Sequence, residues 1–150
     1  MYAFEPDPQQ YQICLDRKER EAFQEAHLFP YGVWSAKDTL HFCAYKGGAS
    51  CIGNGGEISV PVVAIDDVVD PQERVTMIKM DIEGSELEAL RGARKTICRD
   101  KPRLAVCIYH KAEDMTEVPL YIKELVPEYR LYVRHHSKEI GETVFYAVMP

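Results

Sequence analysis

Residues 75–93 read VTMIKMDIEGSELEALRGA and join a predicted strand directly to a predicted helix. The apolar run from Val75 to Met80 is typical of a buried β-strand, and Asp81 and Glu83 follow its carboxyl end. Open α/β sheets bind their ligands in the crevice beyond the carboxyl ends of their strands. The junction after Met80 is therefore the first candidate for a functional site.

One continuous helix is predicted to follow this junction. Its apolar residues recur at three- and four-residue spacing, at Leu87, Leu90, Ala93 and Ile97. Acidic residues lie in its first turn and basic residues toward its end, an order that complements the helix dipole. The helix therefore has one apolar face that can pack against a sheet.

Length and composition fit a single globular domain over residues 1–150. Apolar residues make up 46% of the chain, and no apolar run approaches the ~20 residues of a membrane span. The amino terminus lacks the basic and apolar regions of a secretion signal, so we expect a cytoplasmic location. A net charge of −6 disfavours general affinity for nucleic acid, because such affinity comes from Lys and Arg that neutralise phosphates. The five cysteines include no Cys-x-x-Cys pair and are expected to be reduced.

Upstream of the junction, short strands and one helix are predicted. Tyr2 to Phe4 form a short strand, and Asp7 caps a helix from Pro8 to about Glu21. Leu28 to Trp34 is expected to be extended.

An antiparallel excursion is predicted next, with strands at Thr39 to Tyr45 and Ile58 to Ala64. The Gly-rich connection from Lys46 to Gly56 contains the turn signal Asn54-Gly55. It lacks the glycine motifs that cradle phosphates, so we interpret it as a plain loop.

Downstream of the junction, Leu104 to Tyr109 is a β-rich run that ends at His110. A helix is predicted from Met115 to about Val126, with Pro119 in its first turn. Its partly inward-facing residues are expected to be Leu120, Ile122 and Leu125. Two strands close the chain, at Leu131 to Val133 and Thr143 to Val148.

This order of elements predicts an α/β layered sheet rather than a helix bundle or a barrel. Residues at the strand ends are then expected to gather in one crevice: Glu5, Gly32 to Trp34, Asp81 to Gly84 and His110.

Three parts of the chain resemble the FkbM-type S-adenosylmethionine-dependent methyltransferases. They are residues 2–6 (YAFEP), residues 78–86 (IKMDIEGSE), and a carboxyl-terminal group at 105–111, 134–136 and 142–147. The resemblance covers nearly the whole chain, and its first two blocks are specific in combination. It implies a Rossmann-like class I methyltransferase fold, with a seven-stranded, mainly parallel sheet whose last strand is antiparallel. It also implies methyl transfer from S-adenosylmethionine, usually to an oxygen of a sugar or another small metabolite.

The resemblance implies that two segments bind the cofactor. Glu5 would accept hydrogen bonds from the ribose hydroxyls, as an acidic residue after a strand does in dinucleotide-binding folds. Gly32, Val33 and Trp34 would lie near the adenine.

The resemblance places the chemistry at the two later strand ends. Asp81 would face the methionine part of the cofactor or the acceptor, with Glu83 and Gly84 shaping the turn, and His110 would contact the acceptor. Either His110 or Asp81 can remove the acceptor's proton, and histidine has the more suitable ordinary pKa of about 6.5. Two carboxylates are too few to predict a metal site.

The chain departs from the family at its start, because the family's first strand and Gly-rich turn would precede Tyr2. In the family that strand lies between the second and fourth strands. We therefore expect an N-terminally truncated domain with a gap and unpaired backbone groups near the centre of its sheet. The alternatives are direct pairing of the flanking strands and a strand supplied by another chain.

Each candidate residue also has a purely structural interpretation. Asp81 and Glu83 can cap the following helix. Glu5 can be a turn residue beside Asp7, and His110 can be a partly buried histidine bonded to backbone.

Two other functions are rivals to the methyltransferase. A non-catalytic remnant or partner subunit would keep the fold without binding the cofactor. A nicotinamide-dependent oxidoreductase is disfavoured because the Gly-x-Gly-x-x-Gly motif is missing. The acceptor and the oligomeric state are left open by the sequence.

Overall fold

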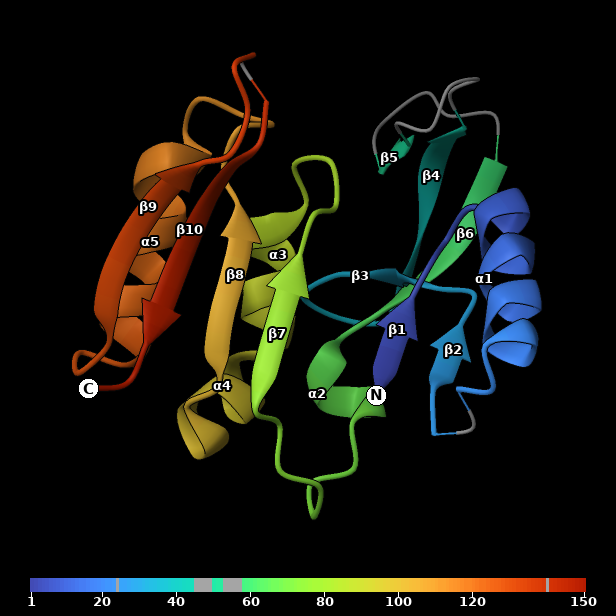
Figure 1. The fold of residues 1–150 in the computed structure, drawn as a ribbon, viewed down its shortest axis with the longest axis horizontal. Helices are drawn as coiled ribbons and strands as arrows, with labels where there is room; N and C mark the ends of the chain where they lie inside the picture. The colour runs from blue at the N-terminus through green and yellow to red at the C-terminus, as the bar shows by residue number, and fades with distance from the viewer. Residues whose placement is uncertain (24, 45–49, 53–57, 140) are drawn as a thin grey trace.

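The computed structural model describes residues 1–23, 25–44, 50–52, 58–139 and 141–150 (Figure 1). Its strands are β1 (Tyr2–Phe4), β2 (His27–Phe29), β3 (Gly32–Val33), β4 (Asp38–Ala44), β5 (Ser50–Ile52), β6 (Ile58–Val63), β7 (Met77–Met80), β8 (Arg103–Cys107), β9 (Arg130–His135) and β10 (Thr143–Val148). Its helices are α1 (Pro8–Arg20), α2 (Ile65–Val68), α3 (Glu86–Gly92), α4 (Arg94–Asp100) and α5 (Asp114–Leu125).

The described strands form three sheets, in the orders β1-β2, β3-β6-β4-β5 and β7-β8-β10-β9. The α/β class is as predicted, but the sheets are mixed rather than mainly parallel. Strands β7 and β8 are parallel, whereas β10 runs antiparallel to both β8 and β9. The expected antiparallel last strand is therefore present. The mixture arises because the chain returns through two antiparallel units, one at β4 to β6 and one at β9 to β10.

The expected single sheet is divided between β1 and β7, which are edge strands of separate sheets. Figure 1 shows β7 and β1 on the facing sides of the two halves of the molecule. A cavity of about 380 Å³ lies between them, lined on one side by Tyr2 and Phe4 and on the other by Met77, Ile78 and Lys79. These are the strands that would flank the family's first strand, and they do not pair directly.

Helix α1 has the predicted start. Asp7 is its N-cap, and one carboxylate oxygen accepts hydrogen bonds from the backbone N–H groups of Gln9 (2.8 Å) and Gln10 (3.0 Å). Pro8 occupies the first turn, where its missing N–H costs nothing. Local sequence is sufficient to specify this element.

The predicted antiparallel excursion is also present, since β4 pairs antiparallel with β6. The plain-loop interpretation of the connection is wrong for Ser50–Ile52, which form β5 and pair with β4. The rest of that connection, including its Asn54-Gly55 turn signal, lies outside the described residues. The predicted extended segment 28–34 is divided into β2 and β3.

The prediction of one continuous helix after the junction is wrong, because the helix is interrupted at Ala93 and continues as α4. The carboxylate of Asp66, in α2, accepts hydrogen bonds from the backbone N–H groups of Lys95 (2.7 Å) and Thr96 (2.8 Å). In a continuous helix those two donors would bond to carbonyls of the preceding turn. A residue about thirty positions upstream therefore caps a new helix.

Helix α5 differs from its prediction in two details. Pro119 lies inside the helix rather than in its first turn. Leu120 is 69% exposed, whereas Val118 and Ile122 are fully buried. The prediction that Leu120 faces inward is wrong, because the buried face of this helix contains Val118 and Ile122 instead.

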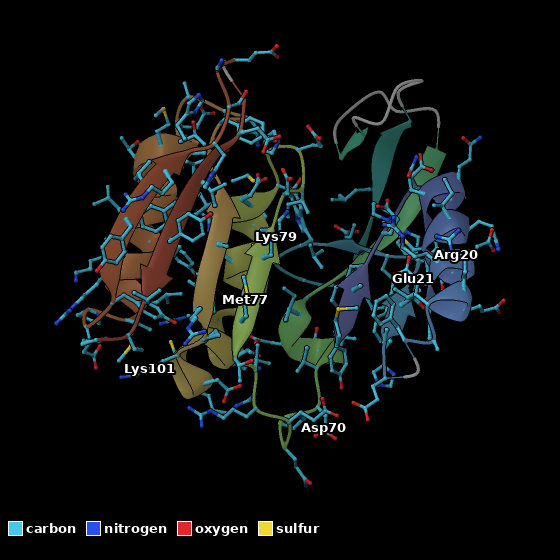
Figure 2. The ribbon with its side chains drawn as sticks, in the orientation of Figure 1. Arg20, Glu21, Asp70, Met77, Lys79 and Lys101 are labelled. Atoms are coloured by element: carbon cyan, nitrogen blue, oxygen red, sulfur yellow. The ribbon has the colours of Figure 1, made fainter. Side chains whose placement is uncertain are left out.

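Strand β7 is shorter than the predicted run, and only one of its faces is buried. Ile78 and Met80 point into the core, while Met77 and Lys79, labelled in Figure 2, are exposed. Figure 1 shows α3 and α5 behind this sheet, and their packing against it forms the core. The largest buried side chains there include Leu90, Ile97, Leu104, Ile122, Tyr129 and Phe145. No helix in the described part of the chain has the length and apolar character needed to cross a membrane.

Candidate active site

The ends of β7 and β8 bring the predicted catalytic residues together. The two strands are parallel, with Met80 opposite Val106, so the segments that follow them leave the same edge of the sheet. Asp81 follows β7 directly, and His110 follows β8 after two further residues.

The imidazole of His110 lies among three carboxylates. Its Nε2 atom is 3.6 Å from Oδ1 of Asp81 and 3.5 Å from Oε2 of Glu83. Its Nδ1 atom is 2.9 Å from Oε1 of Glu86. The side chain is 8% exposed, and Nε2 is buried without a hydrogen-bond partner among the described residues. One ring nitrogen is therefore held by a hydrogen bond, and the other is buried without a partner among the described residues.

The turn that presents these carboxylates has an unusual backbone. Glu83 and Gly84 both have positive φ, 56° and 87°, a conformation that side-chain-bearing residues seldom adopt. The side chain of Lys111 lies over Gly84, since a Cβ there would be 2.8 Å from Lys111 Cε. Strained residues of this kind are frequent at functional sites, where the surrounding structure holds them.

The turn does not use its carboxylates as helix caps. Ser85 is the N-cap of α3 and makes no side-chain capping bond. Within the described residues, no first-turn N–H of α3 donates to Asp81 or Glu83. The interpretation of Asp81 and Glu83 as caps of α3 is therefore wrong.

Glu86 is a site residue that the sequence interpretation missed. It is completely buried, and its Oε1 also accepts a hydrogen bond from the backbone N–H of Ile82 (3.0 Å). Its Oε2 is buried without a partner among the described residues. A signal was available, because Glu86 stands on the apolar stripe of α3, four residues before Leu90. A charged residue on such a stripe indicates a buried carboxylate.

The carboxylates determine the charge state of His110. Burial lowers its pKa, but the hydrogen bond to Glu86 and the charges of Glu86, Glu83 and Asp81 outweigh that effect. The net result is a pKa above the ordinary value for histidine. The imidazolium form is therefore stabilised in the site.

Asp81 is held by other partners and is the weaker base. Tyr109 Oη donates to its Oδ1 (3.1 Å), and Lys79 Nζ lies 3.4 Å from its Oδ2. Burial raises the pKa of Asp81, but hydrogen bonds from Cys107, Tyr109 and Lys79, with the charge of Lys79, lower it overall. Burial and the neighbouring Asp81 carboxylate raise the pKa of the Cys107 thiol to about 12. Tyr109, the last residue of the predicted β-rich run, is thus a partner of the site.

Glu5 has a partner of its own in the turn after β1. Its Oε1 accepts a hydrogen bond from the backbone N–H of Asp7 (2.9 Å), as in the turn interpretation. Burial raises its pKa, and the charge of Asp7 adds to the rise. No hydrogen bond or ion pair in the described part of the chain joins Glu5 to Asp81, Glu83 or His110. Its cofactor role stays a prediction.

Residues Gly32 to Trp34 lie beside α3, near its carboxyl end. Gly32 and Val33 are buried in β3, and the N–H of Trp34 donates to Val63 O (2.9 Å). The backbone of Trp34 packs against Gly92, near the end of α3 remote from Glu86. Their proximity to an adenine also stays a prediction.

The adjacent His135 and His136 do not belong to the site. Both are exposed, and they bond to Thr143 and Tyr146 respectively. Among the residues that the structure describes, no group of three or more His, Cys, Asp or Glu side chains is arranged to hold a metal ion.

Comparison with known proteins identifies relatives of the whole chain. Residues 1–140 match the family described as the methyltransferase FkbM domain. The fold is similar to the crystal structure of methyltransferase FkbM from Methylobacillus flagellatus KT, with a TM-score of 0.77 and 31% sequence identity. This similarity covers 97% of the present chain but only 36% of that protein. No match is found among curated proteins.

Proposed function

The chain belongs to the FkbM methyltransferase family, and we propose that it transfers a methyl group from S-adenosylmethionine to a hydroxyl of a sugar or another small metabolite. The observation that carries this proposal is the meeting of His110 with Asp81 and Glu83 beyond the carboxyl ends of β7 and β8. Bound S-adenosylmethionine supplies an activated methyl group. The protein's task is then to align the acceptor, exclude water and receive a proton.

His110 is the better candidate for the base. Its Nε2 is buried, free of partners among the described residues, and directed at the two carboxylates. Asp81 has a lowered pKa and already accepts from Tyr109, so it is a poor proton acceptor. The bound cofactor would supply the methyl group for the acceptor oxygen, and Nε2 of His110 would receive the hydroxyl proton.

The carboxylates of Asp81 and Glu83 suit an uncharged acceptor rich in hydroxyl groups. An ionised carboxylate only accepts hydrogen bonds, so a ligand beside it must donate. Two such groups also repel phosphate or carboxylate on a ligand. A polyhydroxylated acceptor meets both conditions.

The residues present are compatible with the cofactor. Glu5 directly follows β1 and has a half-buried carboxylate of the kind that accepts from ribose hydroxyls. In this proposal Glu5 holds the ribose, Gly32 to Trp34 lie toward the adenine, and Asp81 and Glu83 face the cationic ammonium and sulfonium groups of the methionine end.

We further propose that another strand occupies the cavity between β1 and β7 and belongs to a segment that precedes Met1 in a longer polypeptide. In the part of the chain that the structure describes, no strand pairs with the two facing edges, and Tyr2, Phe4 and Ile78 supply apolar contacts. The greater length of the solved relative supports this proposal.

Calorimetric titration with S-adenosylhomocysteine tests the cofactor site. Binding should be saturable for the wild-type chain and for Glu19→Ala, an exposed glutamate of α1. Glu5→Ala should weaken binding roughly tenfold or more, because charge-assisted bonds to the ribose are lost.

A folded wild-type chain that does not bind should be retested with the additional strand attached upstream. Binding restored by that strand supports both proposals. Failure of the extended chain to bind contradicts the enzymatic function and favours a non-catalytic subunit.

A further inference from the structure

The contact of His110 with Glu86 is shorter than its contacts with Asp81 and Glu83. Glu86 Oε1 lies 2.9 Å from His110 Nδ1 and 3.0 Å from the backbone nitrogen of Ile82. The backbone N–H of Ile82, in the turn after β7, therefore holds the same Glu86 oxygen that contacts the His110 ring. The contacts from Nε2 to Asp81 and Glu83, at 3.6 and 3.5 Å, are too long for direct N–H···O hydrogen bonds.

We propose that Glu86 is a positioning residue, which holds His110 through Nδ1 and keeps Nε2 directed between Asp81 and Glu83. This inference rests on the proposed function, because it explains how the proton-accepting nitrogen is oriented. A carboxylate can only accept a hydrogen bond, so Glu86 requires the proton of the neutral ring to be on Nδ1. Nε2 then keeps its lone pair for the acceptor's hydroxyl.

The burial of Glu86 argues against a purely structural role. An interior carboxylate is costly, and one of its oxygens has no partner among the described residues. A structural bond to Ile82 N–H needs only a neutral acceptor, which glutamine would supply equally well. The negative charge of Glu86 acts instead on the imidazole, whose protonated form it favours.

The other charged groups around the ring come from three elements. Asp81 and Glu83 stand on the turn after β7, and Asp114 stands at the start of α5, where it is buried and interacts with Glu86. Lys111 lies over Gly84, beside the same turn. Among the described residues only Glu86 bonds to Nδ1, so its removal should affect the ring differently from removal of any neighbouring charge.

Nuclear magnetic resonance of the histidine rings tests the proposal without cofactor or acceptor. The ring nitrogens of His110 are assigned by the loss of their signals in His110→Gln. In the wild-type chain, above the pH at which the ring titrates, the nitrogen shifts should identify the Nδ1–H form. The Nε2–H form would overturn the proposal, and this measurement needs no variant of Glu86.

The Glu86→Gln variant separates the charge from the structural bond. It should fold, because the amide oxygen can still accept from Ile82 N–H, and its His110 titration should move to lower pH. Glu88→Gln is the matched control, since Glu88 lies on the same helix but is paired with Arg91. An unchanged His110 titration in Glu86→Gln, or an equal change in Glu88→Gln, would overturn the proposal. Because no methyl transfer is measured, this result is independent of whether the chain binds S-adenosylhomocysteine.

Discussion

Gly92 in α3 lies directly against the backbone of Trp34, so closely that a Cβ atom at position 92 would be 2.0 Å from the Trp34 carbonyl oxygen. The same Cβ would be 3.3 Å from Ala64 Cα. Backbone atoms on two sides cannot move aside as a flexible side chain can. Only glycine therefore allows α3 to pack against the segment that follows β3.

Gly92→Ala should destabilise the protein, although alanine is the better helix former. The gain in helix propensity is about 1 kcal/mol, whereas forced overpacking typically costs about 1–3 kcal/mol and here displaces backbone. Denaturant unfolding should show a net loss. Gly141→Ala is the control, because its Cβ would meet only Tyr109 Cε2, at an ordinary 3.8 Å. A Gly92→Ala chain as stable as the control would show that the packing is looser than described.

Asp66→Ala should destabilise the α3–α4 region by about 0.5–2 kcal/mol, the usual cost of losing a helix cap. The variant leaves the N–H groups of Lys95 and Thr96 without their acceptor. Asp67→Ala, an exposed change in the same short helix, is the matched control and should have little effect. Chemical unfolding should measure the free energy of unfolding of both variants. Equal losses of stability in the two would contradict a capping role for Asp66.

Tyr129→Phe should cost about 1–3 kcal/mol, because the buried Tyr129 hydroxyl donates to Pro102 O at 2.5 Å. Tyr132→Phe, at a residue 42% exposed on β9, should change stability by less than about 0.5 kcal/mol. Burial also raises the pKa of Tyr129 to about 12. The contribution of the Tyr129 hydroxyl to stability should be complete below about pH 10 and lost as the pH rises toward its pKa in the folded protein. A Phe variant whose stability loss persists unchanged through that range would contradict this linkage.

His110 should stabilise the protein most at acidic pH. Although burial lowers its pKa, the bond to Glu86 and the surrounding carboxylates raise it above the ordinary value. Its contribution is then fully present below about pH 6.5 and lost as the pH rises through the folded pKa. Unfolding free energies of wild type and His110→Gln, measured at about pH 5.5 and about pH 8, should differ more at the lower pH.

His135→Gln provides the control for this pH comparison. His135 is exposed and bonds only to the Thr143 hydroxyl among the described residues. Its variant makes the same His-to-Gln change outside the site. A His110 difference that grows toward alkaline pH would reverse the proposed sign.

Much of the fold could be predicted because the relevant signals are local. Asp7 and Pro8 mark the start of α1 by residues adjacent to it, and the apolar run before Asp81 marks β7. Parallel strands followed by helices place their ends on one edge, so the meeting of His110 with Asp81 and Glu83 was also predictable.

The errors arise where a distant residue competes for the same backbone or the same volume. Asp66 is separated by 29 residues from the backbone donor of Lys95 that it binds, so the residues around Ala93 do not reveal this cap. Leu120 lies outward because of how α5 rotates against the sheet, which depends on its tertiary partners. The division of the sheet between β1 and β7 likewise depends on which strands form backbone hydrogen bonds with each other.

Short-range periodicity and capping thus account for where most strands and helices begin, and the motifs at 2–6 and 78–86 together indicate the family. Tertiary structure alone determined that Glu86, 24 residues from His110 along the chain, is the partner of its Nδ1 atom. The reason is physical: periodicity records which face of an element is buried, but not which polar atoms meet once that face is covered. Those meetings depend on sheet register and helix orientation, which form only when the whole chain packs.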